Sequence, residues 1–393
     1  MVIPIRYHIR NVLVRWRSTV ATLLGIALVV AVFVLLRSLA AGIEKSSAQT
    51  GDPRNILVVR KGSQAESSSL VTREQLQALQ YLKGIALNSE GKPLISADVI
   101  TLISSPRAGG TGEANLLIRG VTSRGRELRP QVHLTKGRWL EPGKREVVVA
   151  ENLARRFADL EMGGILKAGV GRLKVVGLFN GGGSAYDSEV WMDADESRLL
   201  FERDMYSSFI LRPVDDAAYR SLTNIIESDK RFALRAEREV DYYAQQTLTA
   251  VPIKILASLL GSAMSIGAIF AAMNTMYAAI GSRTREIGTL RVLGYSQLSI
   301  LCGFLIEGGL LALLGGIIGV GVSYGLYQYV ILRGITFGTM NFQSFSETIF
   351  QFSMPPVLLL LGLGFSVVVG LVGSILPAWR ASKIPVISAL KSL

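Results

Sequence analysis

Hydrophobic residues are concentrated in four long stretches, one near the N-terminus and three in the last third of the chain. The first runs from Thr19 to Leu36 and spans roughly 27 Å as an α-helix, which is enough to cross the hydrocarbon core of a bilayer. The others are Ile255 to Ser282, Val292 to Leu332 with only Glu307 charged, and Phe352 to Trp379. This pattern predicts four transmembrane helices that frame a long polar segment.

Basic residues flank these stretches unequally. The N-terminal segment, the loop between the second and third stretches and the C-terminal segment carry Arg6, Arg10, Arg15, Arg17, Arg283, Arg285, Arg291, Arg380, Lys383 and Lys391 against the single acid Glu286. Because Lys and Arg resist translocation, all three segments are expected in the cytoplasm. We therefore expect a multipass protein of the inner (plasma) membrane, with cytoplasmic N- and C-termini and an extracytoplasmic polar segment.

The formal net charge of +12 reflects this topology. Residues 43–254 hold 30 Lys and Arg against 27 Asp and Glu, so this segment is nearly balanced and nucleic-acid binding is excluded. The mean hydropathy of +0.38 and the 49% hydrophobic residues are typical of a chain embedded in a lipid bilayer. One cysteine, Cys302, permits no intrachain disulfide, and the two histidines, His8 and His133, make a metal site improbable.

The polar segment has the pattern of a mixed α+β domain. Strands are expected at Asn55–Val59, Leu94–Ser104, Ala114–Val121, Glu146–Val149, Leu173–Leu178 and Ser188–Met192. Helices are expected from the capping box that starts at Thr72 to about Lys83, at Glu151–Leu160 and at Asp215–Ser228.

These patterns divide the chain into consecutive parts. Apolar residues recur on one face of residues 1–17, which indicates a cytoplasmic interfacial amphipathic helix, although a generic basic anchor fits nearly as well. The expected order is residues 1–17, a first span at 18–42, an extracytoplasmic domain at 43–250, and a C-terminal domain at 252–393. Within this last domain we expect spans at about 255–282, 297–331 and 354–378, a short cytoplasmic helix at 283–294, and a cytoplasmic tail at 380–393.

Two cytoplasmic motifs and three extracytoplasmic ones resemble a known family. Residues 283–294 read RTREIGTLRVLG, and the C-terminal motif includes Pro377, Arg380 and Lys383. The polar segment contributes KGRW at 136–139, REVVVAENLA at 145–154 and VVG at 175–177. Together they resemble MacB/FtsX-type permeases, the transmembrane subunits of type VII ABC transporters, whose order of one span, a periplasmic core domain and three spans matches that derived above.

The resemblance implies that the loop after the second span is a coupling helix that docks into an ATPase. The residues that carry this motif are Arg283, Thr284, Arg285, Glu286, Ile287, Gly288, Leu290 and Arg291. Ile287, Leu290 and Leu293 form a narrow apolar stripe, which suits insertion into a groove of a partner protein. The alternative is an ordinary basic loop that only sets the topology.

The chain is expected to be noncatalytic. It contains no Gly-x-x-x-x-Gly-Lys-Ser/Thr phosphate loop, so ATP and Mg²⁺ are expected to bind to a separate ATPase chain, and no cofactor is expected here. Because the sequence starts almost directly at the predicted interfacial helix, it resembles the two-gene systems of the family more than MacB, which has a fused ATPase. The resemblance also implies a homodimer or heterodimer of permeases.

Further candidate residues lie within the third span. Glu307 is an ionisable group at membrane depth, and we interpret it as a scaffold residue bonded to a neighbouring helix, in preference to a proton relay. Two pairs of small residues, Gly315 with Gly319 and Gly321 with Gly325, permit close helix packing within or between protomers.

Three features of the polar segment are weaker candidates. Gly181-Gly182-Gly183 lacks the residues of a phosphate loop, and a hairpin tip is the preferred interpretation. Asp193, Asp195 and Glu196 lack the rest of a calcium loop, so a solvated turn is expected. Ser184 and His133 match no hydrolase signature.

The resulting hypothesis is a permease subunit that transmits ATP-driven motion across the membrane to its extracytoplasmic domain, for efflux or for lipid- or lipoprotein-type export. The resemblance also suggests a periplasmic adaptor and an outer-membrane channel as partners. The alternative is an FtsX-like regulator of a cell-wall hydrolase that transports nothing. A membrane-anchored hydrolase is disfavoured by the missing nucleophile and metal motifs.

Overall fold

The chain forms two compact units in a computed structural model that describes residues 16–110, 112–169, 171–245, 251–340 and 345–385. The helical unit comprises Met1–Ala41, Pro252–Gly334 and Ser353–Leu393, and the polar unit comprises Gly42–Val251 and Ile335–Phe352. The predicted interfacial helix at residues 1–17 lies almost entirely outside the described residues.

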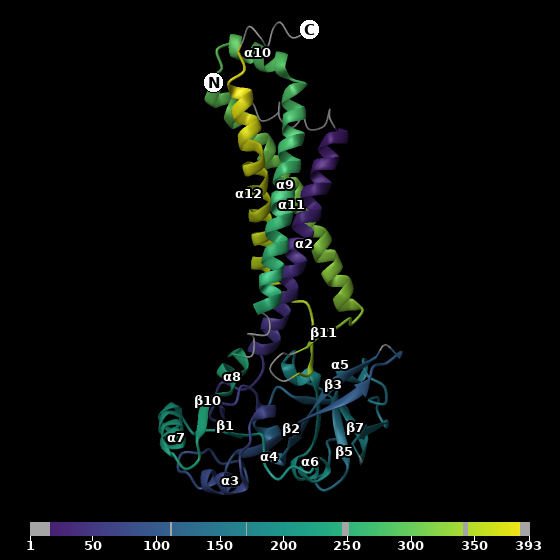
Figure 1. Ribbon diagram of the computed structural model, residues 1–393, viewed down its shortest axis with the longest axis vertical. Helices are drawn as coiled ribbons and strands as arrows, with labels where there is room; N and C mark the ends of the chain where they lie inside the picture. Colours follow the sequence, from purple (N-terminus) through teal and green to yellow (C-terminus); the bar gives the residue numbers. More distant parts are fainter. Residues whose placement is uncertain (1–15, 111, 170, 246–250, 341–344, 386–393) are drawn as a thin grey trace. The chain divides into compact units, whose positions relative to one another are not determined.

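Four long helices build the helical unit and run alongside one another (Figure 1). They are α2 (Trp16–Ala48), α9 (Val251–Gly281), α11 (Gln297–Leu332) and α12 (Pro356–Ser382). Each contains a stretch long and apolar enough to cross a membrane. The four predicted membrane helices are therefore confirmed, and α12 begins as expected for its sequence, with a proline in its first turn.

Small residues let α11 and α12 approach each other closely. A Cβ on Gly308 would meet the side chain of Ser374, and one on Gly370 would collide with Ala312. A Cβ on Gly316 would overlap Ser366 in the same way. Without the hydrophobic effect to drive helices together in lipid, this close packing is what holds such a pair.

The polar unit is an α+β domain built on one mixed sheet, as the sequence predicts. Its strands follow the order β10-β1-β9-β2-β3-β8-β5-β7-β4, with β6 paired to β7. Their bounds are β1 Ile56–Arg60, β2 Ile95–Pro106, β3 Glu113–Val121, β4 His133–Gly137, β5 Glu146–Ala150, β6 Ile165–Ala168, β7 Gly171–Asn180, β8 Glu189–Asp193, β9 Ser208–Leu211 and β10 Leu234–Arg238.

Short helices connect the strands of this sheet or flank them in the chain. They are η1 Glu66–Ser68, α3 Arg73–Gln80, α4 Ser123–Glu127, α5 Glu151–Ala154, η2 Ala185–Ser188, α6 Ala194–Leu200, α7 Asp216–Ser228 and α8 Glu239–Gln245. The predicted capping box of α3 is present, because Thr72 accepts from the Gln75 amide and Gln75 accepts from the Thr72 amide. The helix ends three residues before the predicted Lys83.

One predicted helix is too long. The sequence pattern suggested Glu151–Leu160, but α5 ends at Ala154. Phe157 instead forms an isolated β-bridge with Arg107, and Asp159 adopts a positive φ of 63°, which an α-helix cannot accommodate. Phe157 and Leu160 are both buried, so the apolar residues that suggested a helix are used to pack this turn against the core.

A hairpin from the C-terminal third completes the polar unit. It consists of β11 (Phe337–Met340) and β12 (Glu347–Phe350), which lie between α11 and α12 in sequence. The Glu347 side chain is buried and bonded to Arg156 at 2.6 Å and paired with Arg107 at 2.7 Å. The Ile349 amide donates to the Ser188 hydroxyl at 2.7 Å. The sequence analysis placed this segment in the C-terminal domain, whereas its contacts place it in the polar unit.

Candidate functional site

The predicted coupling segment forms a short helix, α10 (Thr284–Val292), between α9 and α11. Gly294, at a φ of 92°, allows the chain to turn after it, and the Ser296 hydroxyl then caps α11 by accepting from the Ser299 amide. Both neighbours of α10 are candidate membrane spans, so α10 lies at one end of the helical unit.

The apolar stripe predicted for partner binding is divided between two directions. Ile287 is only 2% exposed and belongs to a cluster with Met276, Ile280, Ile300, Phe304, Ala378 and Ala381 of the helical unit. Leu293 of the same stripe is 65% exposed. An amphipathic pattern tells which face is apolar but not what covers it, and here the chain itself covers Ile287 and the neighbouring Gly288.

The outward face of α10 combines charged and apolar groups. It consists of Arg285, Glu286, Thr289, Val292 and Leu293, all of which are exposed. Thr284, Leu290 and Arg291, which the motif also predicted for docking, are partly buried. We call the five exposed residues, from Arg285 to Leu293, the α10 face. Exposed apolar groups beside charges are typical of the rim and centre of a protein interface.

Arg283, immediately before α10, points into the bundle. Its Nη1 atom donates to both carboxylate oxygens of Glu307 on α11, at 3.1 Å each. The two side chains are only 5% and 6% exposed. Glu307 is thus bonded to the segment that precedes α10, and its interpretation as a scaffold residue stays a prediction. Arg283 is therefore not part of the α10 face.

A cavity adjoins this ion pair. Besides Arg283 and Glu307, residues of all four long helices line it, namely Thr19, Thr22, Ile26, Ala272, Thr275, Met276, Ala279, Gly308, Leu311, Gly370 and Ser374. Hydroxyl-bearing residues of α2, α9 and α12 therefore line the same cavity as the ion pair.

The two glycine pairs of α11 have different surroundings. A Cβ on Gly315 would lie 3.0 Å from Ile26 of α2, and one on Gly319 would lie 2.5 Å from the Ala27 carbonyl oxygen. Gly321 and Gly325 have nothing within 4 Å of such a Cβ. The first pair packs within the protomer, and the second lies on a free surface of the described chain.

The C-terminal motif lies on α12. Pro377 is buried inside the helix, where it removes one backbone hydrogen bond. Arg380 lies 5.6 Å from the ring centroid of Tyr277 on α9, and Lys383 lies 4.0 Å from that of Trp379. The first cation–π contact joins α12 to α9, whereas the second lies within the end of α12 itself.

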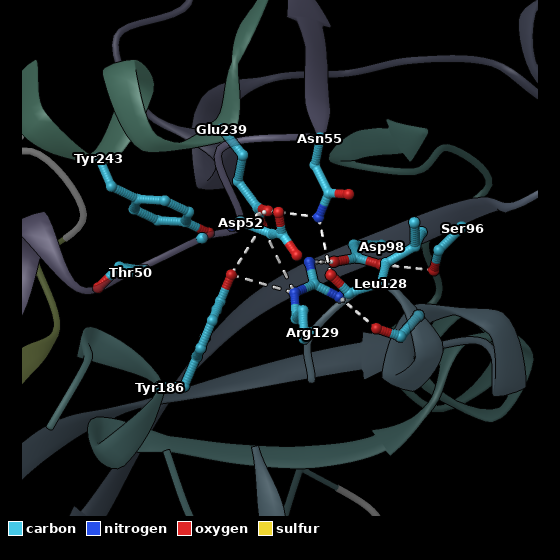
Figure 2. A network of polar contacts seen from close by, with 12 residues as sticks. Thr50, Asp52, Asn55, Ser96, Asp98, Leu128, Arg129, Tyr186, Glu239 and Tyr243 are labelled. Carbon is cyan, nitrogen blue, oxygen red and sulfur yellow. Dashed lines mark hydrogen bonds and ion pairs between the residues drawn. The ribbon is translucent and has the colours of Figure 1, made fainter. Parts of the chain in front are cut away.

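The polar unit contains a network of buried charges that the sequence analysis did not identify. Figure 2 shows Arg129 between Asp98 and Tyr186, with Glu239 accepting from the Tyr186 hydroxyl at 2.7 Å. Glu239 also accepts from the Asp52 amide at 2.9 Å and from the Asn55 side chain at 2.7 Å. Glu239 begins α8, so this network joins the segment that follows α2 to the helix that precedes α9.

Arg119 of β3 is the second centre of this network. It donates to Glu66, Asp98, Glu189 and Tyr243 at distances of 2.8 to 3.2 Å and is 1% exposed. Burial raises the pKa of Glu66, but the Arg119 charge and its hydrogen bonds outweigh burial and hold that pKa below its usual value. An arginine inside the apolar strand Leu116–Val121 is the signal that could have predicted a buried acidic partner.

The weaker candidates have structural roles. Gly181 and Gly183 donate their amides to the carboxylate of Asp187, and β5 separates β7 from β8, so this turn is not the predicted hairpin tip. Asp193 caps α6 by accepting from the amides of Asp195 and Glu196. Ser184 accepts from the Tyr186 amide. No group of three metal-ligating side chains occurs in the part of the chain that the structure describes.

Two protein-family profiles cover most of the chain. The profile described as MacB-like periplasmic core domain matches residues 19–228, and the profile described as FtsX-like permease C-terminal matches residues 258–386.

Named relatives match over different lengths. The ABC transporter permease MJ1507 of Methanocaldococcus jannaschii is 24% identical over 98% of this chain and 97% of its own length. The macrolide export ATP-binding/permease protein MacB of Chromobacterium violaceum is 28% identical over 63% of this chain and 38% of that protein. The ABC transporter permease YknZ of Bacillus subtilis is 32% identical over 37% of this chain and 32% of its own. The chain therefore spans about a third of the last two relatives.

Two solved structures match about half of the chain. The periplasmic region of MacB from Actinobacillus actinomycetemcomitans matches with a TM-score of 0.38 and 14% identity, covering 50% of this chain and 92% of that one. The extracellular domain of YknZ from Gram-positive bacteria matches with a TM-score of 0.36 and 14% identity, covering 47% of this chain and all of that one.

Proposed function

The chain belongs to the MacB/FtsX-type ABC transporter permeases, and from that membership we propose that it couples ATP hydrolysis by a separate ATPase chain to movement of its polar unit. In this proposal the ATPase binds the nucleotide and Mg²⁺ through a phosphate loop, a motif that does not occur in these 393 residues. The permease itself would then be noncatalytic and would transmit motion.

The observation that carries this proposal is the division of α10 into two faces. Ile287 fastens the helix to the bundle, while Val292 and Leu293 are 62% and 65% exposed beside Arg285 and Glu286. A helix that is fixed on one side and presents apolar and charged groups on the other can receive a push from a docked protein and pass it to the helices that hold it.

The membrane orientation follows from the same assignment. We place α10 and the C-terminal motif on the cytoplasmic side of an inner (plasma) membrane, because basic residues concentrate there. The polar unit would then lie outside the cytoplasm and handle its substrate there. We further propose that the substrate is exported with the help of a periplasmic adaptor and an outer-membrane channel. The working assembly would be a dimer of permeases above two ATPases.

The test is to change the α10 face without disturbing the bundle. Leu293→Asp places a charge into the proposed interface and should release the ATPase that copurifies with the tagged wild-type chain from membranes. Leu332→Asp is a matched control, because Leu332 is 84% exposed at the opposite end of α11. The outcome is measured as the amount of ATPase that copurifies and as the ATP hydrolysis of the purified complex. Equal retention of the ATPase by both variants would show that α10 is not its docking site.

Ile287→Asp serves a different purpose. Because Ile287 is buried within the helical unit, an aspartate there should destabilise the permease itself and lower its yield as a monodisperse protein. Loss of the ATPase from this variant alone is therefore no sign of docking, and only the exposed positions of α10 test the proposal.

A further inference from the structure

The ion pair between Arg283 and Glu307 connects the start of α10 to the first third of the membrane helix α11. Arg283 directly precedes α10, and Glu307 lies about three helical turns into α11. Two hydrogen bonds of 3.1 Å from one guanidinium nitrogen join them.

Stability alone is a poor reason for such a pair. Removing two charges from water costs several kcal/mol per ion, so a buried ion pair is often no more stable than well-packed apolar residues of similar volume. What the ion pair adds is a fixed geometry between the two segments that it joins. Apolar contacts, such as those of Ile287, tolerate sliding, whereas an ion pair in a low-dielectric environment fixes both the partner and the distance.

The surroundings of the pair extend its reach. The adjoining cavity is lined by Thr22 of α2, Thr275 of α9 and Ser374 of α12, in addition to Glu307 of α11. The pair therefore lies where all four long helices of the helical unit meet. If Arg283 moves and Glu307 moves with it, the displacement therefore reaches all four helices at this point.

We propose that Arg283 and Glu307 are positioning residues that fix α10 to α11, so that a push on α10 moves the bundle and is not absorbed by local sliding. This inference deepens the proposed coupling function and rests on it. It assigns Arg283 a role inside the permease, distinct from contact with the ATPase.

The experiment measures the position of α10 relative to α11 by electron spin resonance. Spin labels at a cysteine replacing Thr289 and at the native Cys302, both exposed, report the distance between the two helices in the full chain. Arg283→Gln and Glu307→Gln should each broaden the distribution of this distance. The charge-reversed double variant Arg283→Glu with Glu307→Arg should narrow it again, because it restores an ion pair.

Arg333→Gln is the matched control, since Arg333 is exposed at the other end of α11 and should leave the distribution unchanged. Copurification of the ATPase with each variant, without spin labels, is scored separately. The single variants should keep it, because the α10 face is untouched.

The outcomes separate the two proposals. Unchanged distributions in both single variants overturn the positioning role. The positioning role is also overturned if the distance distribution of the charge-reversed variant is as broad as those of the single variants. The same holds if the charge-reversed variant and the single variants all aggregate. Absence of any ATPase from the wild-type preparation contradicts the proposed function instead, whatever the distance distributions show.

Discussion

Replacing Arg119 with methionine should destabilise the polar unit strongly. The substitution keeps an unbranched chain of similar reach but removes the guanidinium that bonds Glu66, Asp98 and Glu189. All three carboxylates are buried, so none can recover its lost bonds from bulk water. In the variant, three negatively charged carboxylates stay buried close together. Arg129 remains as a buried cation, and it pairs with one of them, Asp98.

The expected loss is about 3–5 kcal/mol, the range measured when one partner of a buried ion pair is removed. A domain is typically stable by about 5–15 kcal/mol, so this change consumes a large part of the total. Arg138→Met is the matched control, because Arg138 also forms a two-pronged pair, with Glu146, but its own side chain is 47% exposed. Its removal should change stability little.

The defect should also depend on pH. In the wild type the folded-state pKa of Glu66 lies below its usual value, so its contribution is present above pH 5 and is lost only in stronger acid. Without Arg119, the Ser208 hydrogen bond and the Arg129 charge are left to oppose burial, so the pKa of Glu66 should rise and the folded state should disfavour its ionised carboxylate. The deficit of Arg119→Met relative to the wild type should consequently shrink as the pH is lowered from 8 towards 5.

Hydrogen exchange of β3 and β8 in the purified full chain measures this local stability, because backbone amides in those strands exchange only when the sheet opens. Exchange should be faster in Arg119→Met than in Arg138→Met at pH 8, after correction for the intrinsic pH dependence of exchange. Equal exchange in the two variants, or a deficit that grows in acid, would refute the assignment of Arg119 as the charge that balances these carboxylates.

Three further outcomes are expected. In a cysteine-free background, a cysteine at Ser123 should react with impermeant reagents in intact cells, and one at Gln297 only after permeabilisation; the opposite result would reverse the orientation. Gly319→Val should lower stability by about 1–3 kcal/mol because it overpacks the contact with α2, whereas Gly325→Val should be tolerated in a thermal melt of the protomer. Glu347→Gln should accelerate hydrogen exchange in β12, since it weakens the pairing with two arginines, and unchanged exchange would exclude that role.

Local features of the sequence predicted much of this fold. Span length and apolar composition are properties of a continuous segment, and the four membrane helices follow from them. The capping box at Thr72 and the strand around Leu116–Val121 are equally local. These predictions succeed because the residues that determine each element lie next to one another.

Partners distant in sequence could not be predicted in the same way. Arg119 and Glu66 are 53 residues apart, and nothing in the local pattern of either names the other. The same holds for Ile287, whose burial depends on α9, α11 and α12 together. The α10 motif could be located from sequence, but which of its residues face outward is decided by tertiary packing.

The hairpin of β11 and β12 has a consequence for how the protein is made. Arg156 is synthesised 191 residues before its partner Glu347. At the usual rate of translation this corresponds to roughly 10–40 s, during which α9 and α11 must also enter the membrane. The polar unit therefore finishes folding only when the third membrane helix has crossed and returned the hairpin to it. Until then Arg107 and Arg156 lack the buried carboxylate of Glu347 with which they pair in the finished fold.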